Sequence, residues 1–128
     1  MSRGLADTSV FIARERARPL DRDRLPDEIA VSVITIGELR AGVLAAADVA
    51  TRDMRLATLT EALALEPLPV DDRVTASWAT LRVLLRDSGQ RMPINDSWIA
   101  ATAMAVGVPV ITQDDDHVVV DGLEVIRV

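Results

Sequence analysis

The stretch Gly4-Leu5-Ala6-Asp7-Thr8-Ser9-Val10-Phe11 begins with a short apolar segment and continues into an acidic residue and two hydroxyl residues. We predict the first strand here, over residues 5–10. Ligands of parallel α/β sheets bind beyond the carboxyl ends of the strands, where Asp7 is placed to hold a metal ion or polarise a substrate. Asp is equally suited to cap a helix, because it accepts hydrogen bonds from free helix N–H groups. The choice between these two roles depends on whether the rest of the chain brings other acidic side chains close to Asp7.

Composition limits the chemistry that this chain of 128 residues can perform. Its length suits one domain, residues 1–128, and 49% hydrophobic with 27% charged residues favours a compact globular fold. The absence of cysteine excludes disulfides, zinc–thiolate sites and thiol nucleophiles. All basic residues are Arg, so lysine Schiff-base and Walker-type chemistry is also excluded. We expect a cytoplasmic protein without a membrane segment.

The net charge of −6 disfavours binding of long nucleic acid through a broad basic face. It remains compatible with a nuclease whose acidic pocket is neutralised by a divalent cation. The Arg-rich stretch 14–27 also contains acidic residues and two prolines, so we interpret it as a solvated connector.

Strands alternate with helices along the chain, and no tight hairpin separates the strands. This order predicts an α/β fold, a three-layer α/β/α sandwich around a central, mainly parallel sheet of four to five strands. The expected strands are residues 5–10, 29–33, a weak edge strand at 65–70, 108–112 and 123–128. The expected helices are residues 35–46 and 47–64, which form a helical hairpin, one from Asp71 or Asp72 to Gly89, and a small-residue helix that ends at Gly107.

Four acidic residues are predicted at one edge of this sheet. Asp7 and Asp114 follow strands, whereas Glu38 and Asp96 lie in the first turns of helices. Each has a simpler interpretation as a cap or a loop charge, and Thr35 with Glu38 matches a capping box. Strand carboxyl ends and helix amino ends share one edge of a parallel α/β fold, so we expect the four carboxylates to converge.

Converging carboxylates repel one another and raise one another's pKa. A hard divalent cation removes this repulsion, and Mg²⁺ or Mn²⁺ prefers carboxylate oxygen and water as ligands. Such a site activates water and stabilises a phosphoryl transition state, which favours phosphodiester hydrolysis.

The side chain of Trp78 is interpreted as part of the packing between elements, because a single tryptophan makes a poor base-stacking platform.

Four ordered segments resemble the PIN-domain ribonucleases, and more narrowly the VapC toxins of type II toxin–antitoxin modules. They are Leu5-Ala6-Asp7-Thr8-Ser9, Thr35-Ile36-Gly37-Glu38-Leu39-Arg40-Ala41-Gly42, Asn95-Asp96-Ser97-Trp98-Ile99-Ala100-Ala101-Thr102-Ala103 and Val110-Ile111-Thr112-Gln113-Asp114-Asp115-Asp116. Each segment alone is weak, but their order and spacing cover nearly the whole chain.

The resemblance implies an endoribonuclease that depends on Mg²⁺, with Mn²⁺ as a substitute, and whose metal ligands and catalytic residues are Asp7, Glu38, Asp96 and Asp114. It implies supporting roles for Thr8, Ser9, Asn95, Thr112 and Asp116. Thr8 and Ser9 are expected to cap the helix that follows Asp7, and Asp115 to point away from the site. His117 stands where the family usually carries Phe or Tyr, and we interpret it as a cover of the core.

The resemblance also implies partners: an RNA substrate, a second copy of the chain, and a VapB-like antitoxin in a heterotetramer or a larger complex. The antitoxin is expected on the helical hairpin, at Leu39, Arg40, Val43, Leu56 and Leu59. Two alternatives are an inactive PIN-like binding module and a phosphatase of the haloacid-dehalogenase type. The missing lysine, and the missing second acid two residues after Asp7, disfavour the phosphatase.

Overall fold

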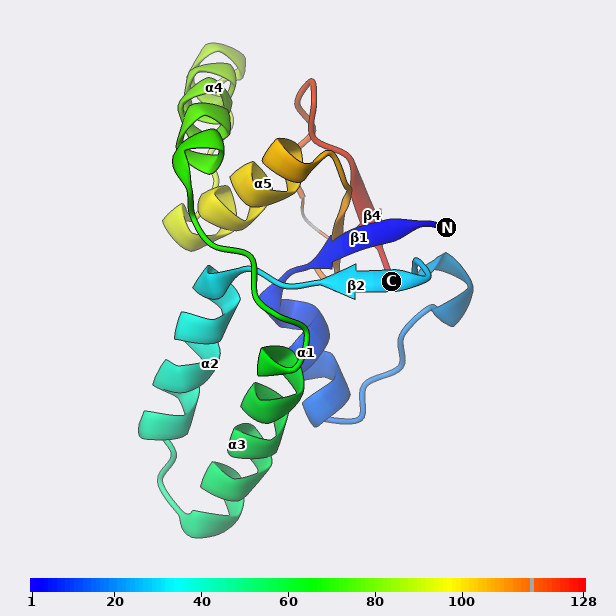
Figure 1. Ribbon diagram of the computed structural model, residues 1–128, viewed down its shortest axis with the longest axis vertical. Helices are drawn as coiled ribbons and strands as arrows, with labels where there is room; N and C mark the ends of the chain where they lie inside the picture. The colour runs from blue at the N-terminus through cyan, green and yellow to red at the C-terminus, as the bar shows by residue number, and fades with distance from the viewer. Residues whose placement is uncertain (116) are drawn as a thin grey trace.

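The computed structural model describes residues 1–115 and 117–128, which form a four-stranded parallel sheet covered by helices (Figure 1). The strands are β1 (Arg3–Ala6), β2 (Glu28–Ala30), β3 (Val110–Thr112) and β4 (Val125–Arg127), in the spatial order β2-β1-β3-β4. The helices are α1 (Thr8–Glu15), the short 3-10 helix η1 (Arg22–Arg24), α2 (Val33–Leu44), α3 (Val49–Leu63), α4 (Asp72–Ser88) and α5 (Ile94–Val106). The predicted α/β class and parallel sheet are therefore confirmed.

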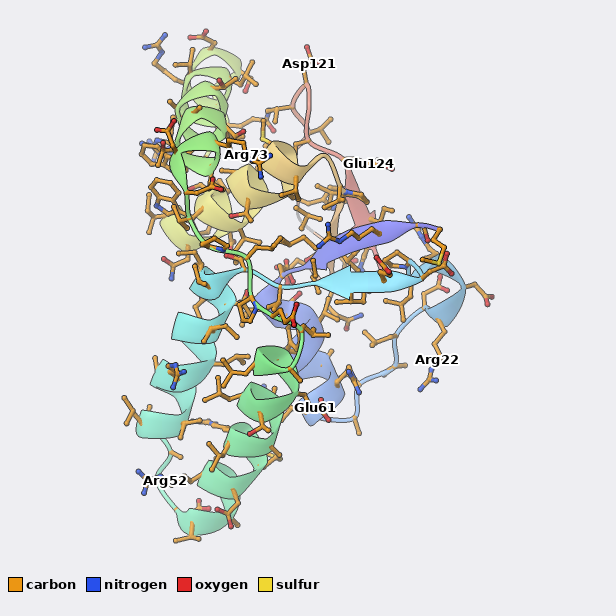
Figure 2. The ribbon with its side chains drawn as sticks, viewed as in Figure 1. Arg22, Arg52, Glu61, Arg73, Asp121 and Glu124 are labelled. Atoms are coloured by element: carbon orange, nitrogen blue, oxygen red, sulfur yellow. The ribbon has the colours of Figure 1, made fainter. Side chains whose placement is uncertain are left out.

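Helices α2 and α3 form the predicted hairpin, which extends away from the sheet (Figure 1). Arg52 lies near the far end of this hairpin, whereas Asp121 lies in the loop before β4 on the opposite side of the molecule (Figure 2). The Arg55 guanidinium joins the two helices by donating to the carbonyl oxygen of Gly42 at 2.7 Å. No helix of the described chain is long and apolar enough to cross a membrane.

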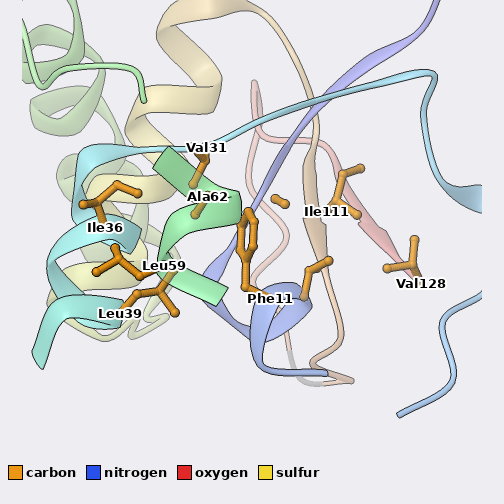
Figure 3. Close-up of a cluster of buried hydrophobic side chains, with 10 residues drawn as sticks. Phe11, Val31, Ile36, Leu39, Leu59, Ala62, Ile111 and Val128 are labelled. Atoms are coloured by element: carbon orange, nitrogen blue, oxygen red, sulfur yellow. The ribbon is translucent and has the colours of Figure 1, made fainter. Parts of the chain in front are cut away.

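Two hydrophobic clusters fill the two sides of the sheet. The first is built from α1, α2 and α3 together with inward-facing strand residues (Figure 3). The second lies between the sheet, α4 and α5. Side chains alternate along β3, so Ile111 belongs to the first cluster and Val110 to the second. This alternation, with helices on both faces, gives the predicted three layers.

Gly4 in β1 leaves room for the side chain of Ile111, which belongs to the neighbouring strand β3. A Cβ atom there would lie 2.6 Å from Cγ1 of Ile111. β1 pairs with both β2 and β3, and its end is fixed by the backbone N–H of Asp7, which donates to Ile111 at 2.9 Å. The residue that follows β1 is thus held at the carboxyl edge of the sheet.

Both predicted strands that precede a helix are too long, because a capping side chain ends each strand earlier. β1 ends at Ala6, since Asp7 caps α1, and β2 ends at Ala30, since Ser32 caps α2 and accepts from the N–H of Ile34 at 3.0 Å. The expected edge strand at 65–70 is wrong as well. Only Leu68 pairs there, through an isolated parallel bridge to Ser32.

The predicted ends of α4 and α5 are confirmed. Asp71 caps α4 by accepting from the N–H of Val74 at 3.0 Å. Gly89 and Gly107 end the two helices with φ angles of 66° and 72°, in the left-handed region that favours glycine. The small residues Ala100 and Ala103 of α5 pack in the second hydrophobic cluster beside Leu5 of β1.

Candidate active site

Three of the four predicted acids line one pocket at the carboxyl edge of the sheet. Asp7, Asp96 and Asp114 contribute to its wall together with Thr112, and the pocket has a volume of about 310 Å³. Glu38 is not part of this wall, but Thr8, next to Asp7, holds its carboxylate. Strand ends and helix starts have thus brought the predicted residues to one place.

Asp7 is both the N-cap of α1 and a member of the pocket. Its Oδ1 accepts hydrogen bonds from the backbone N–H of Ser9, at 3.0 Å, and from the Ser9 hydroxyl. The expectation that Thr8 and Ser9 cap the helix is therefore wrong, and the two interpretations of Asp7 are compatible. Burial raises the pKa of Asp7, the Ser9 hydrogen bonds partly offset that rise, and the Asp114 charge adds to it.

Glu38 is held by a hydroxyl relay rather than by a capping box. Helix α2 begins two residues before Thr35, so Glu38 lies in its second turn and serves no cap. The Thr8 hydroxyl donates to Oε1 of Glu38 at 2.7 Å and lies 3.0 Å from the hydroxyl of the fully buried Thr35. This relay fixes Glu38 of α2 against the first turn of α1.

Asp96 and Asp114 are exposed, in contrast to the first two acids. Within residues 1–115 and 117–128, neither carboxylate accepts a hydrogen bond. Desolvation raises the pKa of Asp96 to about 6, with further contributions from the charges of Asp7, Glu38 and Asp114. Asp96 therefore lies close enough to the other three carboxylates for their charges to act on it.

Ser9 and Thr112 connect β3 to the start of α1. The Ser9 hydroxyl lies 3.3 Å from that of Thr112 and accepts from the N–H of Gln113 at 2.9 Å. Thr112 in turn accepts from the N–H of Asp114 at 3.1 Å. Thr112 thus sets the backbone that carries Asp114.

A tryptophan pair fixes the start of α5, which carries Asp96. The rings of Trp78 and Trp98 stack with centroids 4.4 Å apart, and Nε1 of Trp78 donates to the buried Ser97 hydroxyl at 3.0 Å. Packing of Trp78 is therefore confirmed, but its interpretation as an isolated ring is wrong. No sequence motif links Trp78 to Trp98, because only the packing of α4 on α5 brings the two rings together.

The remaining predicted residues differ in outcome. His117 is exposed and lines the pocket, so its interpretation as a core cover is wrong. Asp115 is exposed, pairs with Arg127 and does not line the pocket. Asn95 is exposed and does not line the pocket. Asp116 lies outside the described residues.

Part of the surface predicted to bind the antitoxin is buried within the helical hairpin. Leu39 and Leu59 are buried in the first hydrophobic cluster, and Val43 packs against that cluster. Arg40 and Leu56 are exposed. The sequence pattern identified the apolar side of the hairpin but did not separate core from surface.

Arg91 and Met92 also line the pocket, and the sequence did not predict them as site residues. They precede α5 in a loop without a recognisable motif, and only their position shortly before Asp96 suggested proximity to the site.

The oxygen atoms of this pocket suit a hard cation, although its carboxylates do not lie close enough together to surround one. The three acids and Thr112 in the pocket wall offer carboxylate and hydroxyl oxygens, the donors that magnesium and manganese sites require. Across the described residues, no three acidic or histidine side chains are close enough to form a ready ligand set. Closure around a cation therefore requires movement of exposed side chains, which Asp96 and Asp114 permit.

Comparison with known proteins gives consistent matches. The PIN domain family model matches residues 5–123. Ribonuclease VapC5 from Mycobacterium tuberculosis is 53% identical over 128 residues, which are 98% of this chain and 95% of the relative. Ribonuclease VapC4 from the same species is 49% identical over 98% of this chain and 97% of its own. A crystal structure of VapBC-5, a member of the VapBC family of toxin–antitoxin systems from M. tuberculosis, superposes with a TM-score of 0.90 at 50% identity and covers both chains completely.

Proposed function

The chain belongs to the PIN-domain family and, within it, to the VapC ribonucleases, and from this premise we propose that its acidic pocket hydrolyses RNA phosphodiester bonds as the toxin of a type II toxin–antitoxin pair. The observation that carries the proposal is the pocket itself, whose wall Asp7, Asp96 and Asp114 share, with Glu38 near enough for its charge to act on Asp96. We propose that residues 1–128 form one PIN domain, of which the family match covers nearly all.

Dependence on a divalent metal is general among PIN-domain ribonucleases, and we propose Mg²⁺ as the cation here, with Mn²⁺ as a substitute. Oxygen-only ligands favour both ions over zinc or copper. We propose Asp7, Asp96, Asp114 and Glu38 as the residues that hold it. When bound, the cation supplies a water activated for attack and neutralises charge on the phosphate.

The protein residues have separable tasks in this scheme. Asp7 offers the carboxylate oxygen that does not cap α1, at a position fixed by the strand end. Thr8 keeps Glu38 oriented, and Thr112 orients the Asp114 backbone. The exposed Asp96 and Asp114 would complete the set of oxygen ligands around the cation. We propose no ligand role for Asn95, and Asp116 remains a reserve acid.

We propose three partners for this chain. The substrate is RNA, as for the ribonucleases it matches, and its reaction takes place in the cytoplasm. The inhibitor is a VapB-like antitoxin, because the matched VapBC-5 structure belongs to a toxin–antitoxin system. The exposed hairpin residues Arg40 and Leu56 remain its candidate contacts, and a homodimer of the toxin forms the centre of a heterotetramer or a larger complex.

Cleavage of single-stranded RNA by the purified protein tests the proposed function. We expect cleavage with Mg²⁺ or Mn²⁺, none with EDTA, and loss of cleavage in Asp7→Ala and Asp96→Asn. Asp53→Asn is the matched control, because Asp53 is an exposed acid on α3. Undiminished cleavage by both pocket variants would contradict the proposal.

A further inference from the structure

The active-site pocket extends beyond the acids into an apolar region. Val110 and Thr112 lie two residues apart on the same face of β3, and both line the pocket. At a rise of about 3.3 Å per residue, the pocket follows the strand for roughly 7 Å away from the acidic edge. There it reaches Val125, which pairs with Val110 on β4, and Leu123.

The residues at this apolar end border the second hydrophobic cluster and keep part of their surface exposed. The walls of this end come from Met92 before α5 and from Val118 and Leu123 in the segment between β3 and β4, all partly exposed. On the α5 side, Ala100 follows Asp96 by one helical turn and lines the pocket with its small side chain. A partly exposed apolar surface directly beside a hydrolytic site is suited to hold part of the substrate.

Arg91 supplies a cation at this acidic pocket. It is exposed, lines the pocket, and within residues 1–115 and 117–128 forms no ion pair. A guanidinium binds phosphate through paired hydrogen bonds or stacks on a base. In a chain with net charge −6, one well-placed Arg contributes more to RNA binding than the general surface does.

We propose that the apolar end of the pocket is a nucleobase subsite for one unpaired nucleotide beside the scissile bond, and that Arg91 holds the phosphate of that nucleotide. This subsite rests on the proposed ribonuclease function. Proteins read RNA mainly through unstacked bases placed against flat or apolar side chains. His117 offers a flat ring, Met92 a polarisable sulfur, and Val118 an aliphatic wall.

The size of the pocket supports a single nucleotide. Its volume of about 310 Å³ stands at the lower end of the range typical of small-molecule sites, roughly 300–1,000 Å³. The subsite therefore selects single-stranded RNA with at least one base free to leave its stack.

Nucleoside 5′-monophosphates test the subsite without turnover, because they contain no phosphodiester bond. We would measure their dissociation constants with Mg²⁺ present by ligand-observed NMR, with ribose 5-phosphate as the probe that lacks a base. Arg91→Gln removes the cation, and Val118→Phe fills the apolar end. Arg52→Gln is the matched control, because Arg52 lies near the far end of the α2–α3 hairpin (Figure 2). Thermal melting verifies that each variant is folded.

In the unmodified protein, we expect the best nucleotide to bind about tenfold tighter than ribose 5-phosphate, the gain typical of one stacked base. Arg91→Gln should weaken both probes about tenfold. Val118→Phe should weaken only the nucleotides, and Arg52→Gln neither probe. Equal binding of nucleotides and ribose 5-phosphate overturns the subsite even if the protein cleaves RNA. Selective nucleotide binding by a protein that cleaves no RNA supports the subsite and contradicts only the ribonuclease proposal.

Discussion

Asp7 and Glu38 form an anchored half of the site, whereas Asp96 and Asp114 form a free half. The anchored carboxylates accept hydrogen bonds from Ser9 and Thr8 at the start of α1. The free carboxylates are exposed and accept no hydrogen bond from the described part of the chain. The fold therefore fixes one side of the proposed metal site and leaves the other side able to adjust.

This division resolves a conflict between stability and function. Four rigidly converged carboxylates without a cation would be strongly destabilising, because like charges repel in a partly desolvated site. Anchoring two of them by hydroxyl groups keeps the geometry, while exposure of the other two lets water screen their charge. Substitutions in the two halves should therefore differ in what they do to the metal-free protein.

The largest effect is expected for Asp7→Ala, which removes an anchored ligand and a helix cap together. We expect cleavage to fall about 10³-fold, since charge stabilisation at the reacting phosphate is lost. The free energy of unfolding should fall by about 1 kcal/mol from the lost cap. RNA cleavage assays and urea unfolding measure the two effects.

Asp7→Asn separates these effects, because an amide oxygen still caps a helix. It should lose cleavage as Asp7→Ala does while it keeps its stability. If Asp7→Asn retained full cleavage, Asp7 would be a cap and nothing more.

In the free half, Asp96→Asn should act in opposite directions on activity and stability. We expect cleavage to fall about 10²-fold. The metal-free protein should become more stable near pH 7.5, because a repelled charge disappears; exposure of Asp96 limits the gain to about 1 kcal/mol. Thermal melting in EDTA measures the gain, and a fall in melting temperature would show that Asp96 is not repelled.

The raised pKa of Asp96 predicts an opposite pH dependence for metal-free and metal-bound protein. Its folded pKa, about 6, exceeds its ordinary value of 3.8, so between these values the folded metal-free state binds more protons than the unfolded state. Its unfolding free energy should therefore rise as the pH falls from 7 to 4. Metal affinity should instead fall below pH 6, by up to about tenfold per pH unit, because a proton competes with the cation.

Calorimetric titrations with Mn²⁺ between pH 5 and 7.5, beside melting curves in EDTA, measure both slopes. In Asp96→Asn both slopes should become smaller. Slopes that do not change in this variant would assign the titration to another group.

The smallest effect is expected for Thr8→Val, which breaks the hydrogen bond that anchors Glu38. Loss of a side chain that orients a ligand typically costs 10- to 100-fold, and we expect about tenfold in cleavage, since Glu38 itself remains. Thr8→Ser keeps the hydroxyl and should restore activity. Full cleavage by Thr8→Val, which keeps the methyl group, beside a loss in Thr8→Ser would show that packing of this methyl group, not the hydroxyl, supports the site.

The positions of the acids were predictable from sequence because they follow from topology. Parallel strands place Asp7 and Asp114 at one edge, and helix starts add Asp96. The division into anchored and free halves was not predictable. It depends on hydroxyl contacts between residues far apart in the chain, such as Thr8 with Glu38 and Ser9 with Thr112.

The two strands that were predicted too long have one physical cause. The β-branched run around Val31 to Ile34 favours a strand by propensity, yet Ser32 offers its hydroxyl to the N–H of Ile34 and starts a helix. The same competition ends β1 at Asp7.

The wrong placement of Leu39 and Leu59 on a partner surface has another cause. Hydrophobic periodicity identifies the apolar side of a helix, but it does not show whether that side packs against the core or against a partner.

Binding of Mn²⁺, followed by the electron paramagnetic resonance signal of the free ion, tests most directly whether this acidic site holds the metal. The unmodified protein and Asp53→Asn should bind Mn²⁺ equally. Asp7→Asn should lose most of the affinity, and Asp96→Asn should lose part of it. Mn²⁺ binding by Asp7→Asn at the affinity of the unmodified protein would contradict the central claim that the strand-end carboxylate anchors the metal.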